Sequence, residues 1–224
     1  MGLTAQAFIR NGFANKFAPT RVISALPRAV KLPALFLLLR AAMTTQCILV
    51  PRASSVPAHE AKARAILRWL VKREIVAALP TTCGSGANGM AYAIAAGARQ
   101  VVEKPALLPY GERLNGLEII TQRSIYTPTR DFLEEAGCPE CRREIGVPLF
   151  DSLEHWWPAE TDHFTCPECG HEDDINGFLF LQPCGFSNLG FIFNGWAEAG
   201  LRPAFVEEFG ERLGYPLAQV EVVV

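Results

Sequence analysis

The sequence predicts an α+β fold, with a mixed or antiparallel sheet and a few helices. Two observations favour this class: short β-rich runs alternate with amphipathic segments along the chain, and they do not repeat as regular βαβ units. A further observation shows that the chain can fold: half of its 224 residues are hydrophobic. That content excludes a disordered chain, and the length is sufficient to bury a sizeable core.

The first predicted elements are a strand and a helix. The strand is the apolar run Cys47–Val50, which ends at Pro51. The helix covers about 57–73, and Ser55 with Pro57 supplies its start. Its apolar residues fall on one side: Ala63, Ile66, Leu67, Leu70 and Val71. The strand and this apolar side of the helix are therefore expected to contribute to one core.

The middle of the chain is less regular. Residues 81–98 are rich in Gly and Ala and predict no definite element. Residues 117–121 and 124–127 are predicted to be strands or one bent strand. Residues 131–136 predict one or two helical turns, which Gly137 closes.

The last part of the chain has strong local signals. Two Phe-rich runs, 178–181 and 189–193, predict strands joined by a hairpin-like link, and their aromatic residues are expected in the core. A helix is predicted from Pro203 to Gly214, because Pro suits a first helical position and Gly a helix end. Residues 220–224 predict a final strand.

Charge divides the chain into unlike parts. Residues 1–42 contain six of the 21 basic residues and no acid, so the remainder carries 15 basic against 23 acidic residues, a net −8. We call residues 1–42 the leader, and three interpretations of it are open. It is untranslated, with the protein starting at Met43; it is a disordered or amphipathic tail; or it is a targeting segment. Its apolar stretch Leu32–Leu39 is far shorter than the ~20 residues of a membrane-spanning helix. We therefore expect no membrane span. We also expect a cytoplasmic protein, because three of the seven cysteines, Cys47, Cys83 and Cys184, are predicted to be free thiols, which a reducing compartment preserves.

Four cysteines form the clearest chemical pattern. The tetrapeptide CPEC occurs twice, as Cys138–Cys141 and Cys166–Cys169, with 24 residues between the pairs. A C-x-x-C turn directs two sulfurs at one metal ion, and two such turns supply the four ligands of a tetrahedral Zn²⁺. Iron, two disulfides and a redox dithiol are the alternatives. Because four thiolates leave no open position on the ion, the predicted zinc is structural.

In these residues the chain resembles zinc-ribbon modules. The resemblance covers about 138–177 and implies one structural zinc held by Cys138, Cys141, Cys166 and Cys169. The whole chain also resembles small bacterial proteins in which a ribbon precedes a Phe-rich hairpin and a C-terminal helix and strand. We therefore predict a zinc-ribbon insertion, 138–177, in an α+β core made of 43–137 and 178–224. His171, beside the second pair, is expected at the surface.

The charge of the ribbon region bears on its partner. Residues 138–177 contain ten acids and two bases, Arg142 and Arg143. Such a surface repels phosphates, so nucleic acid is an unexpected partner. The sequence instead favours a non-catalytic interaction or regulatory protein with a protein partner.

An enzyme is the alternative hypothesis. Residues 84–89 match G-x-G-x-x-G, but a dinucleotide site also needs a preceding strand and a long following helix. Cys83 and Cys184 are candidate nucleophiles, yet the spacing pairs no histidine with either. The enzyme hypothesis places the glycine loop 84–89 and Cys184 in one site near the structural zinc. We predict no catalytic residue.

Overall fold

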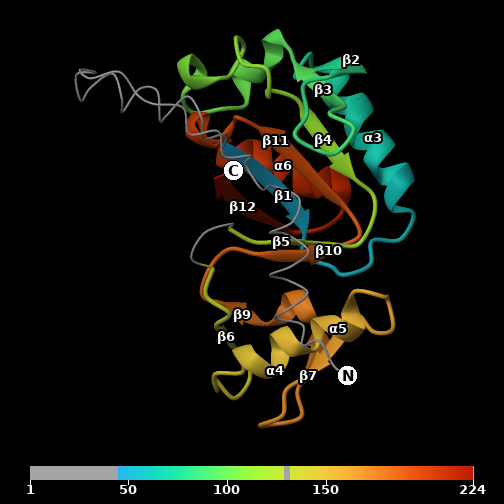
Figure 1. Cartoon of the computed structure of the whole chain (residues 1–224), viewed down its shortest axis with the longest axis vertical. Coiled ribbons are helices and arrows are strands. Elements are labelled where there is room, and N and C mark those ends of the chain that lie inside the picture. The colour runs from blue at the N-terminus through green and yellow to red at the C-terminus, as the bar shows by residue number, and fades with distance from the viewer. Residues whose placement is uncertain (1–44, 129–131, 224) are drawn as a thin grey trace, which may run out of the picture.

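The chain folds around a six-stranded sheet. The computed structural model describes residues 45–128 and 132–223, so the leader 1–42 lies outside it. The strands of the sheet are β1 (Thr45–Pro51), β2 (Val76–Thr81), β3 (Ala91–Ile94), β4 (Leu117–Ile120), β11 (Gly190–Asn194) and β12 (Leu217–Val223). Their order is β12-β1-β11-β4-β3-β2, and every neighbouring pair is antiparallel (Figure 1). The predicted α+β class is confirmed.

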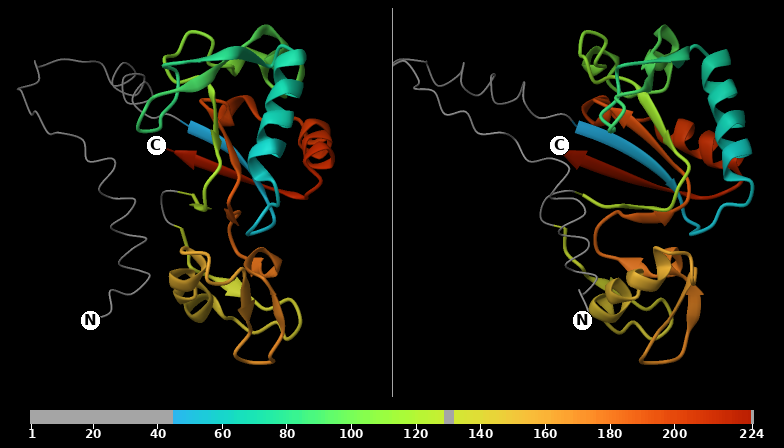
Figure 2. Two further views of the ribbon diagram at one scale, coloured as in Figure 1. Left: turned by 90° about the vertical axis from the view of Figure 1, so that its right-hand side faces the viewer. Right: turned by 45° about the vertical axis from the view of Figure 1, so that its right-hand side comes forward.

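Two longer helices cover one face of this sheet. They are α3 (His59–Lys72) and α6 (Pro203–Leu213), and Figure 2 shows both on the same side. The signals for α6 are confirmed: it begins at Pro203, and Gly214 ends it with a φ of 81°. The start of α3 differs from the prediction, because no side chain caps it. The Ser55 hydroxyl accepts a hydrogen bond from Arg123 instead.

The main core lies between the two helices and the sheet. Its largest side chains are aromatic and come from β11, from the turn after it and from α6: Phe191, Phe193, Trp196, Phe205 and Phe209. Phe191 and Phe209 meet edge to face, with ring centroids 4.8 Å apart. None of the helices formed by residues 45–128 and 132–223 is long and apolar enough to cross a membrane.

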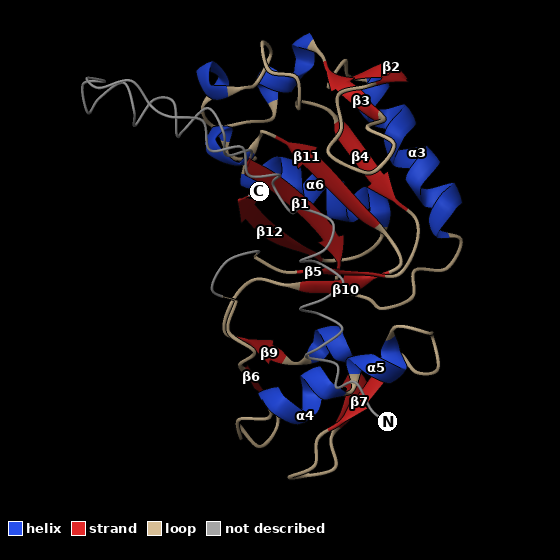
Figure 3. Ribbon diagram, viewed as in Figure 1, coloured by secondary structure: helices blue, strands red, loops and turns tan. Residues whose placement is uncertain are grey.

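A second part of the chain, the cysteine lobe, lies below this sheet (Figure 3). We define it as residues 136–180, because its first and last strands pair with each other. Its elements are β6 (Ala136–Gly137), α4 (Gly146–Asp151), α5 (Leu153–Trp156), β7 (His163–Thr165), β8 (Glu172–Asp174) and β9 (Leu179–Phe180). A small sheet of β5 (Ser124–Tyr126) and β10 (Gly185–Ser187) lies between the lobe and the large sheet (Figure 1).

Two sequence predictions about this region are wrong. No helix forms in 132–136, and Ala136–Gly137 is a strand, because the backbone bonds to distant residues: the Leu181 N–H donates to the Glu135 carbonyl. The predicted hairpin is also absent. Strand β9 pairs with β6, whereas β11 pairs with β1 and β4, and β10 lies between them in sequence. Both errors arise because long-range pairing overrides local signals.

Candidate metal centre

The two CPEC segments form matching turns. In the first, the Cys138 N–H donates to the Arg143 carbonyl (3.0 Å) and the Arg142 N–H to the Cys138 carbonyl (3.1 Å). In the second, the Cys166 N–H donates to the His171 carbonyl (2.8 Å) and Gly170 N–H to the Cys166 carbonyl (2.9 Å). Each bond joins the same relative positions in both repeats, so the repeated sequence produces a repeated structure.

These turns bring the four cysteine sulfurs together. All four Sγ atoms lie within 4.8 Å of one another, and the cluster could hold a metal ion. The Cys138–Cys169 and Cys141–Cys166 sulfurs are 3.7 and 3.8 Å apart. Four sulfurs bound tetrahedrally at about 2.3 Å from an ion are separated by about 3.8 Å. Two of the six sulfur separations therefore match those of a tetrahedral four-sulfur site.

The residue after each pair adopts a left-handed backbone conformation. Gly170 has a φ of 76°, and Arg142, at the equivalent position of the first turn, has a φ of 60°. Glycine reaches this region without a steric penalty, but a residue with a Cβ is strained there. The first turn therefore keeps its shape at a cost of about 1 kcal/mol relative to the second.

The four thiols cannot ionise independently. Burial acts to raise the pKa of Cys138, but hydrogen bonds from the backbone N–H groups of Cys141 and Glu140 outweigh it and lower that pKa to about 7. The His171 N–H acts to lower the pKa of Cys169, but burial and the neighbouring thiols outweigh it and raise that pKa to about 12. Adjacent thiolates repel one another, so a cation among them favours full ionisation.

A hydrophobic core supports the sulfur cluster. Cys138 and Cys166 are buried in it, whereas Cys141 is half-buried and Cys169 exposed. The core also contains side chains from α4, α5 and the flanking strands, including Leu149, Phe150, Leu153, Trp156, Phe178 and Phe186. His171 was expected at the surface, but it is half-buried and its ring contacts Phe178, with centroids 5.8 Å apart.

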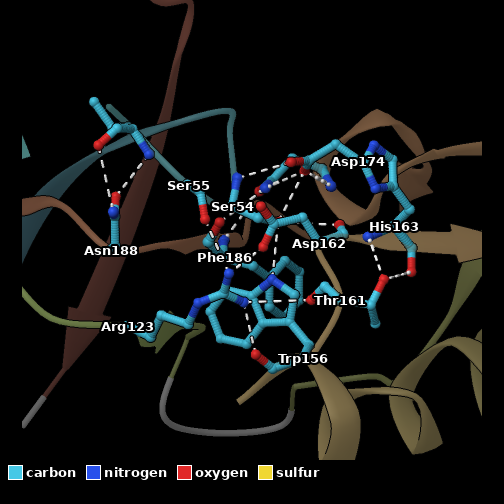
Figure 4. A network of polar contacts seen from close by, with 12 residues as sticks. Ser54, Ser55, Arg123, Trp156, Thr161, Asp162, His163, Asp174, Phe186 and Asn188 are labelled. Carbon is cyan, nitrogen blue, oxygen red and sulfur yellow. Dashed lines mark hydrogen bonds and ion pairs between the residues drawn. The ribbon is translucent and has the colours of Figure 1, made fainter. Parts of the chain in front are cut away.

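A polar network fastens the cysteine lobe to the large sheet (Figure 4). Its centre is Ser54, in the link between β1 and α3, which is fully buried. The Ser54 N–H donates to Oδ2 of Asp174 (2.8 Å), and its hydroxyl donates to Oδ1 (3.1 Å). The same hydroxyl accepts a hydrogen bond from Nε1 of Trp156 (2.8 Å). Because Asp174 ends the strand that follows the second cysteine pair, this contact links the sulfur cluster to the sheet.

Arg123 forms a second connection in the same network. Its guanidinium pairs with Asp162 and donates to the Trp156 carbonyl (2.6 Å). It also lies over the Trp156 ring, 4.8 Å from the centroid. The group is 13% exposed, so solvent screens this ion pair less than an ordinary surface pair. The position of α5 is thus fixed from two sides.

The glycine loop 84–89 surrounds a carboxylate of the chain itself. The N–H groups of Ser85 and Gly86 donate to the two oxygens of Glu118, which is 7% exposed. The Asn194 amide donates to the same carboxylate (2.7 Å). A Cβ on Gly86 would come within 2.6 Å of Glu118 Oε2, which explains the glycine there. Two of the loop's N–H groups therefore bind this carboxylate, and those of Gly84 and Gly89 bond within the loop.

The structure separates the other candidate residues. Cys83 donates to the Ala91 carbonyl in the hairpin of β2 and β3. Cys184 belongs to the core of the cysteine lobe, and burial raises its pKa to about 12. Among the described residues, no hydrogen bond joins a histidine to either thiol. The strand after the glycine loop replaces the long helix that a dinucleotide site requires.

Comparisons with protein-family models, curated proteins and solved structures found no match to this chain. The site is therefore defined by its geometry alone. The four cysteines were predicted from the sequence, but the polar network around Ser54 was not. Ser54 is 102 residues from Trp156 and 120 from Asp174, and no local motif links residues so far apart.

Proposed function

We propose that this chain is a zinc-binding protein of the non-catalytic interaction or regulatory kind, in which one Zn²⁺ bound by Cys138, Cys141, Cys166 and Cys169 is structural. The observation that carries the proposal is the pair of sulfur separations, 3.7 and 3.8 Å, which match a tetrahedral ion. We also propose the division into an α+β core and a zinc-ribbon insertion at 138–177.

The donor set favours zinc among the metals. Thiolate ligands in a tetrahedral arrangement select Zn²⁺ or iron, and hard cations such as Mg²⁺ and Ca²⁺ prefer oxygen. The ligands come from two short turns on a lobe whose own core contains two of the cysteines. The metal would therefore cross-link the two turns of the lobe and stabilise its fold.

A structural role follows from the ligand count. Four thiolates fill a tetrahedral shell, so no position remains for substrate or water. The metal would act through the polar network instead, because Asp174 lies five residues after Cys169 and bonds directly to Ser54. Ordering of the second turn thereby supports the attachment of the lobe to the large sheet.

The surface of the lobe suits a basic protein partner. Eight of the ten acids in 138–177 are exposed, while Asp162 and Asp174 are half-buried in the polar network. The exposed acids are Glu140, Glu144, Asp151, Glu154, Glu160, Glu168, Glu172 and Asp173. Only two bases accompany them, so the surface attracts a cationic partner and repels nucleic acid.

The enzyme hypothesis gains no support from these contacts. It needs the glycine loop and Cys184 in one site, but the loop is occupied by Glu118 and the thiol lies in the core of the cysteine lobe. A thiol with a pKa near 12 is also a poor nucleophile at neutral pH. The interaction hypothesis is therefore preferred.

X-ray absorption at the zinc edge, together with purification from the native host, tests this proposal. We expect four sulfur ligands at about 2.3 Å and a stoichiometric protein partner that is lost on zinc chelation or on charge reversal of Glu172 and Asp173. A shell containing nitrogen or oxygen would contradict the ligand set. A catalytic activity that Cys184→Ser abolishes while zinc is retained would contradict the non-catalytic role.

A further inference from the structure

The two edges of the large sheet differ in their protection against a further strand. Edge strand β2 contains Pro80, and its pairing with β3 shifts register between Val76 and Pro80. Proline and irregular pairing keep additional strands from joining an edge. The other edge strand, β12, contains neither proline nor lysine, and it pairs with β1 through seven consecutive residues (Figure 1). Among the described strands only β1 pairs with β12, so its other edge is open to a further strand.

A groove lies beside this open edge, between β12 and α6. It has a volume of about 680 Å³ and is lined mainly by apolar residues, among them Val206 of α6 and Leu217 of β12. Gln219 also lines it, and Gln219 pairs with Leu49, whose side chain belongs to the main core. Since paired residues of adjacent strands point to the same face, the groove lies on the helix side of the sheet. A strand added to β12 would therefore direct every second side chain into the groove.

The charged side chains of the groove are acidic. Glu207 and Glu211 line it from α6, and both are exposed. Neither forms an ion pair with a described residue, whereas Glu208, between them in sequence, pairs with two arginines. Like charges four residues apart on a helix repel each other, so a cation beside them is favourable. The single charged residue of β12, Glu221, is also an exposed acid. The groove therefore combines an apolar lining with a negative charge.

We propose that this groove binds an extended segment of a partner protein, which adds to β12 as a further strand and carries Lys or Arg at alternate positions. The backbone of the segment bonds to the open edge of β12. The aliphatic stem of each basic side chain packs on Val206 and Leu217, and its charged end reaches Glu207 or Glu211. A second copy of this chain fits less well, because it brings the same acids to the groove. The surface belongs to the large sheet and α6, so the proposal does not rest on the zinc site.

Binding of a synthetic peptide to the full chain tests the proposal. The probe is a fluorescent peptide as long as β12, with blocked ends, in which lysine and valine alternate. We expect Glu207→Lys with Glu211→Lys to weaken its binding at least about tenfold. The matched control is Glu112→Lys with Glu198→Lys, the same charge change at exposed positions outside the groove, and it should leave binding within about threefold of the parent.

Three results of this titration would overturn the proposal. They are no binding at a peptide concentration of about 1 mM, equal losses in the two double variants, and a loss on charge reversal of Glu172 and Asp173 alone. The last result would place the basic partner on the cysteine lobe, so it would leave the proposed function standing.

Hydrogen exchange separates strand addition from charge attraction alone. With the peptide at saturation, the amides of β12 that do not bond to β1 should exchange at least about tenfold more slowly. A peptide of the same composition with its lysines in one block should bind at least about tenfold more weakly, because it lacks the alternation of a strand. Unchanged exchange in the complex would overturn the proposal. So would protection of these amides that grows with the concentration of the protein alone, because a second copy would then occupy the edge.

Discussion

The indole Nε1 of Trp156 donates a 2.8 Å hydrogen bond to the hydroxyl of Ser54, and both residues are buried. Trp156 belongs to the cysteine lobe, whereas Ser54 follows strand β1 of the large sheet. The hydroxyl also donates to Asp174. One small side chain therefore fixes two elements of the lobe against the sheet.

Ser54→Ala should destabilise the protein by about 1–3 kcal/mol, because Trp156 Nε1 and Asp174 each lose a buried partner. Urea unfolding measures the change. Ser55→Ala is the matched control: its hydroxyl also accepts a hydrogen bond, from Arg123, but its side chain is exposed. That control should stay within about 0.5 kcal/mol of the parent. Equal losses in the two variants would contradict a central role for Ser54.

Arg142→Gly should raise the stability of the zinc-loaded protein by about 1 kcal/mol, because glycine relieves the strain at a φ of 60°. Gly170→Ala should lower it by a similar amount, since it creates the same strain in the second turn. Competition with a zinc chelator measures both effects. A loss of zinc affinity in Arg142→Gly would show that the arginine side chain matters more than its backbone conformation.

Thiol labelling at pH 8 should distinguish the cysteines. Burial raises the pKa of Cys47 and of Cys184 to about 12, so only about one thiol in ten thousand is ionised at this pH. Both should remain unlabelled by iodoacetamide. Of the cluster thiols, Cys138 has its pKa lowered to about 7, so it should react once zinc is chelated and resist while zinc is bound. Mass spectrometry of the peptides reads the pattern, and rapid labelling of Cys184 in folded protein would contradict its position in the core.

Glu118→Gln should cost about 1.5–3 kcal/mol, because the carboxylate accepts hydrogen bonds from Ser85, Gly86 and Asn194, and an amide can accept at only one of its two terminal atoms. The glycine loop should also become more sensitive to limited proteolysis. Glu112→Gln, at an exposed position, is the control and should change neither property. An unchanged loop in Glu118→Gln would contradict the contacts described for it.

Local chemistry made part of the structure predictable. The helix from Pro203 to Gly214 was readable because its start and end signals act within a few residues. The cysteine pairs were readable because the spacing of a C-x-x-C turn is itself the ligand geometry. The α+β class followed from the alternation of elements, which depends on no particular partner.

The sequence did not predict which distant residues of the chain each segment contacts. Residues 131–136 predict one or two helical turns, yet Ala136 pairs with Phe180 of β9, and the Glu135 carbonyl accepts a hydrogen bond from the Leu181 N–H. The glycine loop matches a phosphate-binding pattern, but its ligand is Glu118, more than 30 residues away on β4. The Ser54 network joins residues over 100 positions apart. In each case the decisive contact is made by distant residues, so no sequence window contains it.

Metal analysis of purified protein, with and without one ligand, tests the central claim most directly. We expect about one zinc per chain in the parent and in Cys83→Ser, whose thiol lies outside the cluster, and none in Cys166→Ser. Loss of metal should also free the lobe, seen as faster exchange of the Cys138 and Cys166 amides that bond within the two turns. Full retention of zinc in Cys166→Ser, or a parent protein that binds no zinc, would contradict the account.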